Sequence, residues 1–405
     1  MRSLWTRVLF VYAVAATAVT VGLAMRDRPA DRVAPAPSPD RDRVADSSGV
    51  AAEPTTLKPA PPPPEPAKAA PVVPEVKKAL DWLVERQGKD GGLGQNDGSE
   101  PDVANTAMAA LALFRSGNTP KSGPYRDALA RAVDFVRRNV ESSGDGDAYV
   151  TTRHDTQPQR KVGPFVDTFL ACQLLGEVDG NMPDLAAQSQ VRAALDRCVK
   201  KTQSCQAADG SFNQGGWAPV LGSTFACKAL QIAEVKGAKV DRDALARAED
   251  YMLGLQNRED GRIDASAGAG VDLYARSAVA YSLSAKPRVT ESGEMAFTAP
   301  AAAEHAPAVA TAARELGRGE VLRGFGSMGG EEFVSYMMAS TSLAGPDGQG
   351  STQWNGQIRG DLAKLQNADG SWAGSHCITG RVFCTSAAVL TLVEASTPKI
   401  ASSAR

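Results

Sequence analysis

The sequence predicts an all-α protein, an (α/α)6 toroid in which six outer helices surround six inner ones. Two observations predict this fold. Two kinds of helical segment alternate along the chain from about residue 75, and the turns that join them repeat as well. A helical hairpin cannot bury its own apolar face, so repeats of this kind must stack on one another. Closing the stack into a ring covers every such face without end caps.

The first kind of segment is amphipathic and charged. Its apolar residues recur at three- and four-residue spacing, which is typical of a helix with one buried face. Clear examples cover residues 76–87, 125–139, 190–203, 242–256 and 354–366, and an alanine-rich stretch at 301–316 is less well marked. These segments are expected to form the outer ring.

The second kind of segment is nearly all apolar and rich in small residues. Six nine-residue blocks align without gaps, and they start at Asn105, Asp167, Gly222, Ala275, Ser335 and Cys384. Every block ends in leucine, and its fifth position, one helical turn earlier on the same face, is alanine or valine. A helix that is apolar on all sides is buried on all sides, so these blocks predict the inner ring.

The turns between outer and inner helices share a glutamine followed by Asp-Gly. They start at Gln87, Gln206, Gln256 and Gln366. The glycine is expected to take a left-handed conformation, and the glutamine to cap carbonyls at the end of a helix.

The residues before the toroid predict export. No charged residue lies between Arg7 and Arg26, so residues 1–26 are expected to be a signal anchor or a cleaved signal peptide, and we favour the anchor. Residues 27–74 form a Pro/Ala-rich linker that cannot bury a core. The toroid then covers residues 75–395, and residues 396–405 are a tail. Export would place the body in the cell envelope, anchored to the inner membrane or periplasmic.

The net charge of −2 and the pI of about 6.0 give no indication of nucleic-acid binding. Expected partners are instead the membrane, through the N-terminal helix, and a small molecule or another envelope protein.

The segment Gln366-x-x-x-Gly370-x-Trp372 resembles the QW motif of squalene–hopene cyclases and related triterpene cyclases. The repeat as a whole is similar to the β subunits of protein prenyltransferases, and most similar to exported bacterial proteins built from such repeats. The resemblance covers about residues 75–395 and implies an α/α toroid. It does not transfer a function, because one fold carries many functions.

The chain departs from these families where their chemistry lies. It lacks the Asp-x-Asp-Asp motif with which the cyclases protonate their substrate. The prenyltransferase zinc site needs a Cys two residues after a carboxylate and a His before the last inner helix. Here Asp272 is followed by Tyr274, and Cys384 stands in the histidine's place.

The segment SHCITGRVFC, residues 375–384, is the part of the last repeat that has no counterpart in the others. His376, Cys377 and Cys384 could bind zinc, or Cys377 could act as a nucleophile beside a histidine. A disulfide between Cys377 and Cys384 is the alternative that an exported protein favours. Zinc is therefore a possible cofactor, and the three residues are candidate catalytic or metal-binding residues.

Acidic residues near the starts of inner helices are candidates for a binding site at the mouth of the ring. They are Asp167, Asp272, Glu331 and Glu332, with Arg381 as a positive group. Paired carboxylates could act on a glycoside, but helix capping explains acids at these positions equally well.

The sequence therefore indicates a binding or scaffold domain that lacks the superfamily's complete catalytic sites. The alternative is an enzyme that acts on a small or lipid-like substrate in the ring cavity, by zinc-dependent transfer or terpene cyclase-like chemistry.

Overall fold

The computed structural model describes residues 73–212, 215–257, 259–284, 286–290, 295–344 and 351–396, which all belong to one compact unit, residues 66–405. Residues 1–26, most of the linker and nearly all of the tail lie outside the described residues. Among the described residues, no helix combines the length and apolar character needed to span a membrane.

Six inner helices form a closed ring. They are α2 (Val103–Arg115), α5 (Val166–Val178), α7 (Pro219–Val235), α9 (Asp272–Leu283), α12 (Gly330–Ala344) and α14 (Arg381–Ser396). Each packs against the next in this order, and α14 packs against α2, which closes the ring. Every nine-residue block lies within one of these helices, so the predicted inner ring is confirmed.

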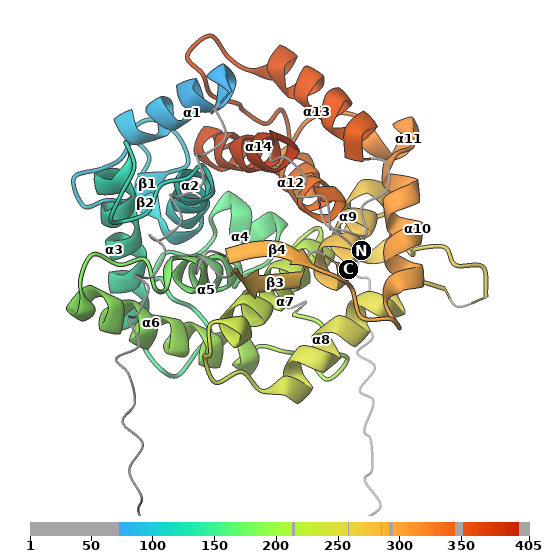
Figure 1. Cartoon of the computed structure of the whole chain (residues 1–405), viewed down its shortest axis with the longest axis horizontal. Coiled ribbons are helices and arrows are strands. Elements are labelled where there is room, and N and C mark those ends of the chain that lie inside the picture. Colours follow the sequence, from blue (N-terminus) through green and yellow to red (C-terminus); the bar gives the residue numbers. More distant parts are fainter. Residues whose placement is uncertain are drawn as a thin grey trace, which may run out of the picture. The chain divides into compact units, whose positions relative to one another are not determined.

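Six outer helices surround this ring (Figure 1). They are α1 (Pro74–Glu85), α3 (Arg126–Ser142), α6 (Leu185–Ser204), α8 (Arg242–Gly254), α10 (Ala306–Leu316) and α13 (Ser351–Leu365). Each outer helix contacts the two inner helices that flank it, so that α1, for example, lies against α14 and α2. The protein is therefore the predicted (α/α)6 toroid.

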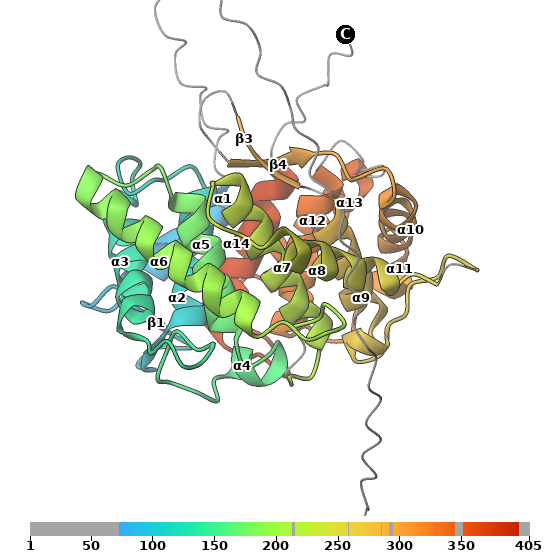
Figure 2. The ribbon, with the colours of Figure 1, turned by 90° about the horizontal axis from the view of Figure 1, so that it is seen from below.

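Short elements cover the two ends of the ring (Figure 2). The hairpin of β3 (Lys286–Val289) and β4 (Met295–Ala299) lies at one end, and α4 (Gln157–Lys161) lies at the other. Smaller elements lie in the connections: β1 (Leu93–Gly94), β2 (Pro101–Asp102), the 3-10 helix Ser266–Gly268 and α11 (Gly319–Leu322). The sequence did not predict these elements.

The glutamine turns join each outer helix to the following inner helix, and three of the four also bond to the next outer helix. The glutamine Nε2 donates to the carbonyl of the turn's glycine, over 2.9, 3.1, 3.1 and 2.9 Å for Gln87, Gln206, Gln256 and Gln366. In three of the turns it also donates to a carbonyl in the first turn of the next outer helix, at Ala128, Ala244 or Glu75. The glutamine therefore links successive outer helices, instead of capping the helix that precedes it as predicted.

Charged side chains lie in the ring beneath the hairpin. Arg115 of α2 forms a two-pronged ion pair with Glu177 of α5, over 2.6 and 2.9 Å, and lies 3.4 Å from Glu394 of α14. Phe297 of β4 covers this pair, with its ring centroid 4.4 Å from Arg115 Cζ and 6.0 Å from Lys228 Nζ. Burial lowers the pKa of Lys228 to about 7. The ring therefore contains a charged cluster that the hairpin covers.

Candidate functional site

Two loops meet at the end of the ring where the inner helices begin. The loop of residues 374–380 contains His376 and Cys377, and the glycine-rich loop of residues 324–329 leads into α12. They pair through backbone hydrogen bonds from Ser375 to Met328, 2.6 Å, and from Gly330 to Ile378, 2.9 Å. We call this region the mouth site.

Glycine is required where the two loops touch. A Cβ atom on Gly330 would lie 2.7 Å from Ile378 Cβ, and one on Gly329 would lie 2.8 Å from His376 Cε1. Gly329 and Gly330 therefore let the His-Cys loop approach.

The Glu332 carboxylate lies at the start of α12, where the backbone N–H groups of a helix can bind an anion. It is fully buried, and it accepts hydrogen bonds from the backbone of Gly329, 2.8 Å, and of Phe325, 3.0 Å, and from the Tyr274 hydroxyl. Burial and the nearby Glu332 carboxylate raise the pKa of Tyr274, so its hydroxyl remains a donor. The donors of this helix N-terminus thus bind a side chain of the protein itself.

His376 contacts the same carboxylate. Its Nε2 lies 3.1 Å from the Ser327 carbonyl and 3.3 Å from Glu332 Oε2. Both neighbours are acceptors, so Nε2 carries the hydrogen. The Nδ1 atom is buried and has no hydrogen-bond partner among the described residues.

Glu331 differs from Glu332 although both side chains are fully buried. One of its oxygens, Oε2, accepts from the backbone of Ile378 at 3.3 Å. The other, Oε1, has no hydrogen-bond partner among the described residues. Burial raises the pKa of Glu331. A buried carboxyl with a spare oxygen is a group that a ligand can satisfy.

Cys377 and Cys384 are both free thiols in the structure. Cys377 is half-buried and has a left-handed backbone, φ +52°, while Cys384 is buried and donates to the Ile378 carbonyl over 3.6 Å. Burial and the charge of Glu331 raise the pKa of both thiols, which disfavours the reactive thiolate. In the part of the chain that the structure describes, no three His, Cys, Asp or Glu side chains are placed to hold a metal ion.

Aromatic rings form a continuous row across the mouth site. Trp217, just before α7, meets Tyr274 at 6.1 Å and Phe325 at 5.8 Å between ring centroids, and Phe325 meets His376 at 5.2 Å. Phe325 is 57% exposed, which is unusual for phenylalanine. The sequence did not single out Trp217 and Phe325, because they lie in connections outside the repeat.

Asp167 lies at the start of α5, where α4 crosses the mouth. Its oxygens accept from the Ala104 backbone, 3.0 Å, and from Gln159 Nε2 of α4, 2.8 Å. Burial, followed by the charge of Asp102, raises the pKa of Asp167 to about 7. At its first residue α4 also holds the His-Cys loop, because Gln157 Oε1 accepts from the backbone of Thr379 at 2.9 Å.

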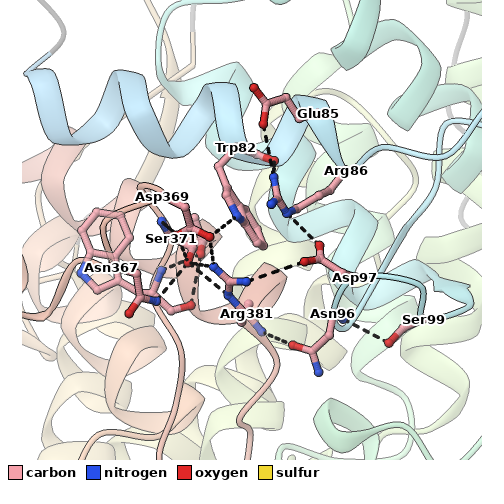
Figure 3. A network of polar contacts seen from close by, with 12 residues as sticks. Trp82, Glu85, Arg86, Asn96, Asp97, Ser99, Asn367, Asp369, Ser371 and Arg381 are labelled. Carbon is pink, nitrogen blue, oxygen red and sulfur yellow. Dashed lines mark hydrogen bonds and ion pairs between the residues drawn. The ribbon is translucent and has the colours of Figure 1, made fainter.

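The two remaining candidates have structural partners. Asp272 is half-exposed and pairs with Arg276 at 2.6 Å. Arg381 pairs with Asp369, and its guanidinium lies 4.8 Å from the Trp82 ring (Figure 3). The structure thus brings together Glu331, Glu332, His376, Cys377 and Cys384. It gives Asp167, Asp272 and Arg381 separate sets of contacts.

Comparison with known proteins finds similarity at the level of structure. No protein-family model matches this sequence. The search of curated proteins gives no match. Among solved structures, the α-1,6-mannanase GH76A of Salegentibacter sp. HEL1_6 is similar with a TM-score of 0.49 and 10% identity, over 80% of this chain and 98% of that chain. A variant of the type II terpene cyclase MstE from Scytonema is similar with a TM-score of 0.33 and 14% identity, over 80% and 96%. These likenesses assign no substrate or residue role to this chain.

Proposed function

We propose that this chain is an exported toroid domain that binds a cyclic ligand at the mouth site. The observation that carries the proposal is the row of rings from Trp217 through Phe325 to His376, in which Phe325 is largely exposed. An exposed aromatic face stabilises a ligand that has an apolar ring face of its own. Saccharides of the cell envelope have such faces.

Polar groups beside the row support binding. Glu331 Oε1 and His376 Nδ1 are buried without hydrogen-bond partners among the described residues. A few convergent polar groups beside an apolar surface are typical of ligand sites. Glu332 is already satisfied by three donors and by His376, which makes it a support of the site and a poor candidate for a catalytic base.

The position of the domain in the cell is part of the same proposal. The uncharged run from Val8 to Met25 would hold the chain in the inner membrane, and the Pro-rich linker would let the toroid reach ligands in the envelope. A scaffold role toward another envelope protein would use the same arrangement.

One observation favours a second candidate, an enzyme that uses acid catalysis. The pKa of Glu331 is raised by burial, as it is in carboxyl groups that donate a proton to a leaving group. An enzyme of this kind would need substrate to reach Glu331 from the mouth.

Binding can be tested with chitotetraose and mannotetraose by saturation-transfer NMR and calorimetry. We expect at least one to bind, and Phe325→Ala to weaken it about three- to tenfold, as loss of one ring contact implies. Leu185→Ala is the control, since Leu185 is 88% exposed on α6, an element outside the mouth site.

Absence of binding by the wild-type chain, or equal binding by Phe325→Ala, would contradict the proposal. Turnover of either sugar by the wild type that is lost in Glu331→Gln, with binding kept, would favour the enzyme instead.

A further inference from the structure

A cleft separate from the mouth site lies on the outer side of the ring. It is a cleft of about 360 Å³ between α11, the loop of residues 323–328, α12 and α13. Its volume falls in the range of small-molecule sites, about 300–1,000 Å³. The glycine-rich loop separates it from the mouth site: Gly326, Ser327 and Met328 line the cleft, whereas Phe325 between Gly324 and Gly326 contacts Trp217 and His376.

Apolar side chains form most of the cleft. They include Leu322, Met328, Tyr336, Trp354, Ile358 and Leu365. Leu365 is 44% exposed and is one of the few large apolar side chains that the described residues leave in solvent. With the half-buried Leu322 and Met328, it gives the cleft an apolar wall that an apolar group can cover.

The polar atoms of the two aromatic side chains already have partners inside the protein. Tyr336 donates to the Leu322 carbonyl over 2.6 Å, and Trp354 Nε1 donates to Ser340 Oγ over 2.8 Å. Neither group needs a ligand. A hydrocarbon chain, which has no polar groups to satisfy, fits this part of the lining.

The polar residues of the cleft carry more positive than negative charge. Arg323 and Lys364 contribute two cations and Asp361 one carboxylate, and all three residues are exposed. Lys364 Nζ lies 3.5 Å from Asp361, an exposed pair that contributes little, and the described residues give Arg323 no ion pair.

We propose that this cleft binds the aliphatic chain of a single-chain anionic amphiphile, such as a fatty acid, with its head group toward Arg323. The apolar lining fits the chain, and the excess positive charge fits the head. The proposal goes beyond the mouth site and does not depend on it, because the two sites use opposite sides of the glycine-rich loop and different chemistry.

The test uses displacement of the fluorescent fatty acid cis-parinarate from the purified chain by saturated fatty acids of eight to fourteen carbons. Affinity should rise about fourfold with each methylene until the cleft is full, because each buried methylene contributes about 0.8 kcal/mol. An alcohol of matched length should bind several-fold more weakly than the acid in the wild type, but equally in Arg323→Gln.

Leu365→Asp should abolish displaceable binding, and Leu185→Asp, an equally drastic change on α6, should leave it intact. Both positions are exposed enough to tolerate the change, and circular dichroism checks their folding. Tight parinarate binding that Leu365→Asp leaves unchanged would overturn the proposal. Binding restricted to anionic phospholipid vesicles, or to Pro-rich peptides, would also overturn it and would assign the cleft to a membrane or a protein partner.

Discussion

At the scale of single residues, the glycine of three of the four glutamine turns is fixed by two independent constraints. Gly91, Gly210 and Gly370 all have positive φ, between +87° and +95°. A Cβ atom on them would also meet a backbone carbonyl of the next outer helix, at 2.2 Å, 2.0 Å and 2.8 Å. The Asp-Gly sequence predicted the backbone conformation, but only the packed ring shows the close approach.

The two constraints can be separated by substitution. Gly237→Ala, at φ +76° with no atom within 4 Å of the new Cβ, should cost roughly 1–2 kcal/mol of folding free energy from backbone strain alone. Gly210→Ala should cost at least about 3 kcal/mol, because overpacking against Arg247 adds to the strain. Urea denaturation measures both, and equal losses would mean that the helices can separate at no cost.

Residue types and spacing also explain which site residues could be predicted. Glu331, Glu332, His376, Cys377 and Cys384 stand out in the sequence as rare polar groups beside apolar blocks, and they do meet. Their partners could not be predicted. Glu332 is held by Tyr274, Phe325 and Gly329, which come from an inner helix and a connecting loop, and only the folded ring brings these together.

At the scale of elements, α4 is the short helix that joins separate parts of the mouth. Its start is a capping box, in which Thr156 and Gln159 satisfy each other's backbone. Its end accepts hydrogen bonds from Trp217 and Ala218, where α7 begins, at 3.0 and 2.9 Å. Five residues are too few for a helical period, so only the Thr-x-x-Gln pattern of residues 156–159 in the sequence indicates this element.

The burial of Asp167 beside Asp102 should make stability depend on pH. The pKa of Asp167 is raised to about 7 by burial and by Asp102, so the folded chain holds a proton that the unfolded chain has lost above about pH 4. Its contribution to stability is therefore complete below the unfolded pKa and is lost as pH rises through about 7.

We expect the urea midpoint of the wild type to fall between about pH 4 and 7, and the fall to be smaller in Asp167→Asn, whose side chain does not titrate. Asp264→Asn is a matched control, because Asp264 is an exposed carboxylate whose pKa is lowered by the backbone and hydroxyl of Ser266. An unchanged pH slope in Asp167→Asn would show that the native carboxyl is ionised throughout this range.

The hairpin of β3 and β4 covers the opposite end of the ring. A pattern in the sequence indicates what lies beneath this hairpin. Arg115, Glu177 and Glu394 each follow the last leucine of an inner block by two residues. This shared position places three charges at equivalent points of neighbouring helices, where they pair. Extending the aligned blocks by two residues at their C-terminal ends predicts this charged cluster.

At the scale of the whole molecule, the first and last repeats close the ring. Gln366 donates to the Glu75 carbonyl of α1 over 2.9 Å, and Trp82 of α1 donates to Asp369 over 3.1 Å. The Trp82 ring also lies between two guanidinium groups, at 4.3 Å from Arg86 and 4.8 Å from Arg381 (Figure 3). The periodic pattern predicted six repeats, but the contacts that join their ends involve residues 287 and 291 positions apart.

Closure of the ring should make its stability cooperative, whereas an open stack of repeats loses stability piece by piece. Trp82→Ala removes a side chain that is 2% exposed and should cost about 3–5 kcal/mol of folding free energy.

Two fully buried free thiols report on the effect from opposite sides of the inner ring: Cys384 on α14, next to α1, and Cys227 on α7. If the ring opens as one unit, native-state labelling of both thiols should accelerate by the same factor, roughly 100-fold or more. Trp82→Phe, which keeps an aromatic ring and loses the bond to Asp369, should give a smaller and equally shared increase. Acceleration at Cys384 with Cys227 still protected would show instead that the repeats unfold separately and that the closing contacts stabilise only the repeats they join.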